Sequence, residues 1–141
     1  METGNPVRVT VQAVIQAPVE KVWEYWSKPE HITKWNQATD EWHAPWAEND
    51  LRVGGRFVTR MEAKDGSMGF DFCGIYDVVK VHEEIAYTLD DGRKVTVLFM
   101  ARGNETEVVE TFDAESAHPV EFQRAGWQAI MDNFKKYAES R

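Results

Sequence analysis

Hydrophobic and polar residues alternate at the start of the chain. From Val7 to Ile15 every odd position is apolar, and polar side chains occupy most of the even positions. A period of two is typical of a strand that has one face in the core and the other in water. We therefore expect a half-buried strand over residues 7–15.

The pattern becomes helical after Pro18, whose fixed φ suits the first position of a helix. Four large apolar residues follow at i, i+3, i+4 and i+7, which predicts a short amphipathic helix: Val19, Val22, Trp23 and Trp26. Ser27 followed by Pro29 indicates the start of a second short helix, with an apolar face at Ile32 and Trp35.

The middle of the chain is predicted to form a series of strands. Residues 39–49 predict a weak strand and an irregular loop, and five segments rich in β-branched and aromatic residues follow, at 56–62, 68–80, 84–89, 93–102 and 105–113. Three of the joints carry the glycines or asparagine of tight turns, namely Asp65-Gly66, Asp91-Gly92 and Gly103-Asn104. An antiparallel meander is the expected pairing.

The last segment, about residues 119–138, has helical spacing. Its stripe of mostly apolar positions is Gln123, Trp127, Ile130, Phe134 and Tyr137. Strands that are grouped together, with one long helix available to cover their apolar face, predict an α+β fold.

Composition limits the function classes. At 141 residues the chain fits one domain, 1–141, with a core over about 7–139. A net charge of −8 without a basic stripe argues against nucleic acid, and no apolar run approaches the ~20 residues of a membrane span. The N-terminal residues lack a secretory pattern and Cys73 is alone, so we expect a cytoplasmic protein.

Motifs along the whole chain resemble those of the START-like, or SRPBCC, helix-grip superfamily, and within it the domain shared with activators of the heat-shock-protein-90 ATPase. The matching residues are Ile15-Gln16-Ala17-Pro18 with Glu20, Val22, Trp23 and Trp26; Pro29-Glu30 and Trp35; Gly54-Gly55-Arg56-Phe57; Gly74 with Glu84, Ile85 and Tyr87; and Gly126-Trp127 near Phe134. The resemblance implies a curved antiparallel sheet of six or seven strands wrapped around a long C-terminal helix, with two short helices after the first strand and a largely apolar cavity inside.

The aromatic surplus, including six tryptophans, supplies candidates for the walls of that cavity. The residues that we predict to bind a ligand are Trp35, Trp42, Phe57, Met61, Phe72, Phe99, Trp127 and Met131. Plain core packing is the alternative for each of them. Alternation alone does not say which face of a strand points inward.

Two carboxylates lie within apolar stretches, Asp71 and Glu110. We expect both to face water, because an ionised group is seldom buried without a partner; facing a dry cavity, either would have a raised pKa. We expect a solvated hairpin face to carry three acidic residues, Glu105, Glu107 and Glu110. Arg56 and Arg60 share a strand face and could pair with such an acid, hold an anionic ligand, or simply lie exposed.

The four histidines are far apart and never at i, i+4, so we expect no metal. His43, beside Trp42, is a candidate general base or polar anchor, or else a solvated loop residue. No phosphate loop, dinucleotide fingerprint or nucleophile motif is present in the sequence, and we expect no cofactor.

These observations favour a domain that binds a small hydrophobic or aromatic molecule between sheet and helix. A second hypothesis is a module that binds a protein partner and modulates a chaperone ATPase, although we expect this chain to lack the additional N-terminal domain of the full activator. A third is an enzyme of the cyclase or hydrolase kind, which two ionisable groups converging in the cavity would favour. A homodimer is possible under each of them.

Overall fold

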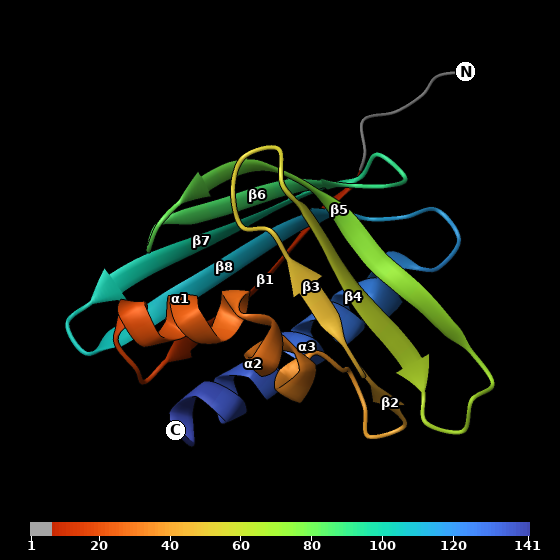
Figure 1. Cartoon of the computed structure of the whole chain (residues 1–141), viewed down its shortest axis with the longest axis horizontal. Coiled ribbons are helices and arrows are strands. Elements are labelled where there is room, and N and C mark those ends of the chain that lie inside the picture. The colour runs from red at the N-terminus through yellow and green to blue at the C-terminus, as the bar shows by residue number, and fades with distance from the viewer. Residues whose placement is uncertain (1–6) are drawn as a thin grey trace.

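The computed structural model describes residues 7–141, and in this part of the chain three helices pack against one curved antiparallel sheet (Figure 1). The strands are β1 (Arg8–Ile15), β2 (Trp42–His43), β3 (Ala47–Asn49), β4 (Arg56–Ala63), β5 (Gly69–Lys80), β6 (Glu84–Leu89), β7 (Lys94–Arg102) and β8 (Glu105–Asp113). Their order in the sheet is β1-β8-β7-β6-β5-β4-β2, and β3 pairs with β4 beside β2. The predicted meander and the helix-grip α+β class are confirmed.

The predicted alternation in β1 is also confirmed. Val9, Val11 and Ile15 are buried on the inner face, while the polar residues between them are exposed. The tight turns follow the glycine positions as expected, because Gly66, Gly92 and Gly103 all have positive φ, a backbone region that glycine enters without steric cost.

Two short helices, α1 (Val19–Ser27) and α2 (Pro29–Trp35), follow β1 as predicted. Ser27 does not start the second helix, however. It is the last residue of α1, and its hydroxyl donates a hydrogen bond to the carbonyl of Trp23 at 2.7 Å, four residues earlier. Lys28 takes the N-cap position instead, and Pro29 is the first residue of α2.

The segment 39–49 holds two short strands instead of one weak strand. Both pair with β4, Trp42 opposite Ala63 and Ala47 opposite Thr59. The sheet of the described chain therefore has eight strands. These two strands extend the sheet at the edge that borders the cavity described below.

Gly54 and Gly55 fix the entry into β4. Gly54 has a φ of 83°, and a Cβ on Gly55 would lie 2.0 Å from the carbonyl oxygen of Asp50. Neither position suits another residue.

Helix α3 (Val120–Glu139) crosses the concave face of the sheet (Figure 1). Its two halves differ in burial, because Met131, Phe134 and Ala138 of the C-terminal half are at most 1% exposed, whereas Gln123 alone is buried in the first half. Trp26 of α1 and Trp35 of α2 each pack against Phe134, with ring centroids 4.9 Å away. The C-terminal half of α3 is therefore held in the core by both short helices.

None of the helices within residues 7–141 combines the length and the apolar composition needed to cross a membrane.

Candidate functional site

A cavity of about 950 Å³ lies between the sheet and the N-terminal half of α3. It is enclosed by inward-facing side chains of β4, β5, β6 and β8, by residues of α2, and by one face of α3. From α3 come Phe122, Gln123, Gly126, Trp127 and Ile130. The cavity exists because the first half of the helix crosses the concave sheet without filling it.

Aromatic side chains form much of the cavity wall. Phe57 of β4 packs edge-on against Tyr87 of β6 with centroids 4.7 Å apart, and in a tilted arrangement against Tyr76 of β5 at 5.3 Å. On the opposite wall the indole of Trp127 stacks on Phe112 of β8 at 3.9 Å, with the ring planes 9° apart. A wall of this kind suits flat, apolar molecules.

The mouth of the cavity is apolar as well. Three exposed apolar residues line it: Met68, which directly precedes β5, Phe70 in β5, and Phe122 in the first turn of α3, which are 64%, 50% and 66% exposed. The opening therefore lies between the β4–β5 hairpin and the N-terminal end of α3. Large apolar side chains that are exposed together at one opening are typical of a ligand entrance.

Glu110 of β8 faces the cavity, which overturns the expectation that it faces water. Its side chain is on the same face of β8 as Val108 and Phe112, and the residue is only 6% exposed. The strand alternation decides this orientation, since Glu107 has the opposite parity and Glu110 cannot share its face. Burial raises the pKa of the Glu110 carboxyl to about 8.

Two tyrosines also line the cavity and differ in their partners. The hydroxyl of Tyr76 donates a hydrogen bond to the side-chain oxygen of Asn49, whereas the hydroxyl of Tyr87 makes no hydrogen bond within residues 7–141. Burial first, and then the carboxyl group of Glu110, raises the pKa of Tyr87 well above its ordinary value. Tyr87 and Glu110 therefore line the same cavity.

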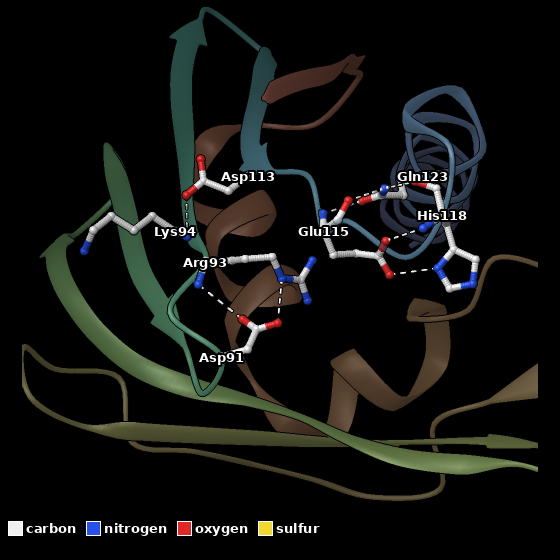
Figure 2. Close-up of polar contacts among 7 residues, drawn as sticks. All are labelled: Asp91, Arg93, Lys94, Asp113, Glu115, His118 and Gln123. Atoms are coloured by element: carbon white, nitrogen blue, oxygen red, sulfur yellow. Dashed lines mark hydrogen bonds and ion pairs between the residues drawn. The ribbon is translucent and has the colours of Figure 1, made fainter. Parts of the chain in front are cut away.

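A hydrogen-bonded loop borders the mouth (Figure 2). The side chain of Gln123 accepts a bond from the N–H of Glu115 at 2.8 Å and donates to the carbonyls of Glu115 and His118 at 3.0 and 2.9 Å. The ring of His118 lies 2.7 Å from the Glu115 carboxylate, and this hydrogen bond lowers the pKa of Glu115. The loop that joins β8 to α3 is thus fixed to the first turn of the helix.

Arg93 approaches the same mouth from the β6–β7 turn. Its Nε lies 2.8 Å from Asp91, and Figure 2 shows the guanidinium directed toward the loop that carries Glu115. On the far side of β7, the backbone N–H of Lys94 donates to Asp113 at 2.9 Å, so the turn is held on both sides. A cationic group therefore lies at the edge of the cavity.

The structure brings together six of the eight predicted ligand residues around the cavity: Trp35, Trp42, Phe57, Met61, Phe72 and Trp127. The other two are not among its lining residues. Phe99 is buried against Trp23 and Trp26 of α1, at 5.2 and 6.0 Å between centroids, and Met131 is fully buried in the second half of α3. That the six bind a ligand stays a prediction.

The remaining candidates lie outside the cavity. Asp71 is exposed, as expected, and pairs with Arg60 at 3.1 Å; Arg56 pairs with Asp90. His43 is a partly exposed residue 3.8 Å from Glu62 and does not line the cavity. Within residues 7–141 no group of three or more potential metal ligands comes together.

Several lining residues were missed at the level of sequence, above all Tyr87, Arg93 and Gly126. A signal existed for Gly126, because it lies four residues from both Phe122 and Ile130 and so shares their helical face. Arg93 follows a turn and carries no such signal.

The chain matches the family model described as "Activator of Hsp90 ATPase homolog 1-like protein" over residues 16–139. No curated protein gives a significant match. Among solved structures, the AHSA1-like protein of Aeromonas hydrophila is 45% identical, with a TM-score of 0.88 and coverage of 95% of this chain and 93% of that one. Chr148 of Cytophaga hutchinsonii is 53% identical, with a TM-score of 0.80 and coverage of 97% and 94%.

A more distant structure, protein CV1439 of Chromobacterium violaceum, shares the fold at 23% identity, with a TM-score of 0.84 over 94% of this chain and 96% of that one. The family match spans most of the chain, and the structural likeness extends over nearly all of it. The chain belongs to the family of activator of Hsp90 ATPase homolog 1-like proteins.

Proposed function

We propose that this protein binds a small hydrophobic or aromatic molecule in the cavity between the sheet and α3. The observation that carries the proposal is the cavity itself, about 950 Å³ in volume and lined mostly by apolar surface, much of it aromatic. A space of this size falls within the range of drug-sized ligand sites, and its few polar groups would orient the ligand.

The mouth supports the same proposal. Met68, Phe70 and Phe122 expose apolar surface where solvent meets the cavity, and a ligand crossing that boundary would exchange water for apolar contacts. The polar loop fixed by Gln123 borders the opening without closing it.

The test is a thermal-shift and tryptophan-fluorescence screen against aromatic and lipid-like compounds. Trp26, Trp35, Trp42 and Trp127 line the cavity and would report occupancy. Compounds that bind should raise the Tm of the wild type. Uniformly flat responses would contradict the proposal.

Two variants of neighbouring residues on α3 make the screen specific. Gly126→Phe places a ring in the cavity, since the space beyond the Gly126 Cα is open, while Ala125→Phe places the same ring on the exposed face of the helix. We expect Gly126→Phe to weaken binding about tenfold or more through steric exclusion and Ala125→Phe to leave it unchanged. Equal binding by both variants would place the ligand elsewhere.

A second candidate function is an enzyme, and the presence of two ionisable groups, Glu110 and Tyr87, in one cavity favours it. A carboxyl with a pKa near neutrality is suited to general acid–base catalysis. The discriminating observation is whether a bound compound is recovered unchanged after prolonged incubation. Chemical conversion that depends on Glu110 would favour the enzyme.

We propose that residues 1–141 form one START-like domain with a core over about 7–139, acting in the cytoplasm, with no nucleic-acid partner. A homodimer or a protein partner is compatible with a single ligand cavity.

A further inference from the structure

Glu110 occupies the middle of an otherwise apolar surface. In the register of the sheet it lies between Val11 of β1 and Val97 of β7, and along its own strand between Val108 and Phe112. These four neighbours are at most 1% exposed. A carboxyl group in such surroundings destabilises the fold unless something pairs with it.

No residue of the described chain pairs with it. Within residues 7–141 the Glu110 carboxyl makes no hydrogen bond and no ion pair, although the residue is 94% shielded from solvent. It borders the cavity, so its free oxygens face that space. Because burial raises the pKa of Glu110 to about 8, the group is a neutral acid at pH 7 and carries an O–H that can donate.

Tyr87 supplies a second O–H of the same kind. It projects from β6 on the same face of the sheet, it is 8% exposed, and its hydroxyl has no partner within residues 7–141. Burial and the nearby Glu110 carboxyl keep its phenol protonated by raising its pKa. Two neutral donors therefore share a cavity whose walls are otherwise mostly apolar.

We infer that Glu110 and Tyr87 form a polar anchor that hydrogen-bonds the carbonyl oxygen of an uncharged aromatic ligand. This inference rests on the proposed function and names the ligand class. A carbonyl oxygen has two lone pairs and can accept from both groups, and it leaves no charge buried in the cavity. The aromatic walls would hold the remainder of the molecule.

Charged ligands fit this interior less well. An ammonium group would require an ion pair in a desolvated site, and the cost of removing two charges from water offsets their attraction. The other ionisable groups around the cavity are Tyr76 on β5, Arg93 at the β6–β7 turn, and Glu115 and His118 in the loop before α3. From β1 and β7 the neighbours of Glu110 are Val11 and Val97, and no lining residue of α3 is charged.

The experiment compares four naphthalene probes of similar size in binding titrations followed by the indole N–H signals of the tryptophans. The probes are 2-acetylnaphthalene, the hydrocarbon 2-isopropenylnaphthalene, 1-(2-naphthyl)ethylamine and 2-naphthoate. At pH 6.5 we expect the ketone to bind about tenfold more tightly than the hydrocarbon, which corresponds to two modest hydrogen bonds. The amine and the carboxylate should bind more weakly than the ketone.

Variants of Glu110 test whether this residue causes the preference for the ketone over the hydrocarbon. Glu110→Leu should reduce the ketone preference to less than threefold, because it removes one donor and fills its site with methyl groups. Glu110→Gln keeps a donor and should retain most of the preference. In the wild type the preference should decline between pH 7 and 9 as the carboxyl ionises, whereas in Glu110→Gln it should stay constant over that range.

The outcomes separate the two proposals. If hydrocarbon and ketone bind the wild type equally, or the amine binds most tightly, the anchor is overturned while the proposed function stands. If none of the four probes binds, both proposals are overturned for aromatic ligands. A ketone preference that persists in folded Glu110→Leu, checked by its NMR spectrum, would also overturn the role of Glu110.

Discussion

The indole of Trp127 on α3 lies flat against the phenyl ring of Phe112 on β8, 3.9 Å from centroid to centroid. Phe112 is 1% exposed, while Trp127 presents its other surface to the cavity. One ring pair therefore joins the N-terminal half of the helix to the sheet, and its indole forms part of the cavity wall.

Trp127→Ala should destabilise the protein by about 2–4 kcal/mol, because the stack is lost and the cavity is enlarged. Trp127→Phe keeps a ring over Phe112 and should cost less than half as much. Urea denaturation monitored by circular dichroism measures both changes. Equal losses would show that stacking on Phe112 contributes little.

Stability should fall as the pH rises from about 4.5 to 8, owing to Glu110. Its pKa is raised from 4.5 to about 8 in the folded protein, so between these values the native state holds a proton that the unfolded chain releases. The contribution is fully present below pH 4.5 and is lost by pH 8, at roughly 1.4 kcal/mol for each pH unit.

Glu110→Gln removes this dependence. The variant should gain stability relative to the wild type as the pH rises across that window, and the difference should level off above pH 8. Parallel denaturation curves at closely spaced pH values test this. A difference between the two proteins that does not change with pH would mean that Glu110 is ionised in the fold.

Gly126→Ala should stabilise the protein by about 0.5–1 kcal/mol. Gly126 is within α3, its φ is not in the left-handed region, and no atom lies within 4 Å of the site of an added Cβ. Alanine therefore lowers the entropy cost of forming the helix without a clash. Thermal denaturation would measure the gain, and a loss of stability would show that the space beside Gly126 is already filled.

Gly74→Ala should have the opposite sign. A Cβ at this position of β5 would lie 2.4 Å from the carbonyl oxygen of Thr88 on β6, and the neighbouring backbone cannot move without breaking the ladder. We expect a loss of at least about 2 kcal/mol by the same measurement. Near-neutral behaviour would indicate that β5 and β6 separate easily at this point.

Gln123→Met should loosen the loop beside the cavity mouth. Gln123 is buried and makes three hydrogen bonds to the backbone of Glu115 and His118, so the loss should be about 2–3 kcal/mol. Gln128→Met is the matched control, because Gln128 forms exposed bonds on the other side of the same helix. Similar costs for both substitutions would contradict the anchoring role of Gln123.

The fold was predictable because strong local signals agreed with one another. Alternation in β1, the glycines of three hairpins and the helical spacing after Pro119 all pointed to one architecture. The error at Ser27 arose because a serine before a proline resembles an N-cap, while this hydroxyl bonds back to Trp23 within the preceding helix.

The site was predictable only in part. Glu110 shows why. The rule that carboxylates avoid burial predicts that its side chain faces water, whereas the alternation of β8 predicts that it faces inward, and in the structure it faces inward. Glu110 is two residues from both Val108 and Phe112, so it shares their strand face, and this spacing would have indicated that its side chain points inward. Phe99 and Phe72 have similar strand contexts, and only the position of α1 over β7 makes the first a core residue.

The unequal burial of α3 has a consequence for how a guest molecule would enter. The C-terminal half of α3, which carries Phe134 and Ala138, lies in the core, while the N-terminal half, which carries Phe122 and Gly126, borders the cavity and contains fewer buried residues. Backbone amides of the N-terminal half should exchange with deuterium sooner than those of the C-terminal half. Outward bending of the N-terminal half would widen the entrance while the core stays intact.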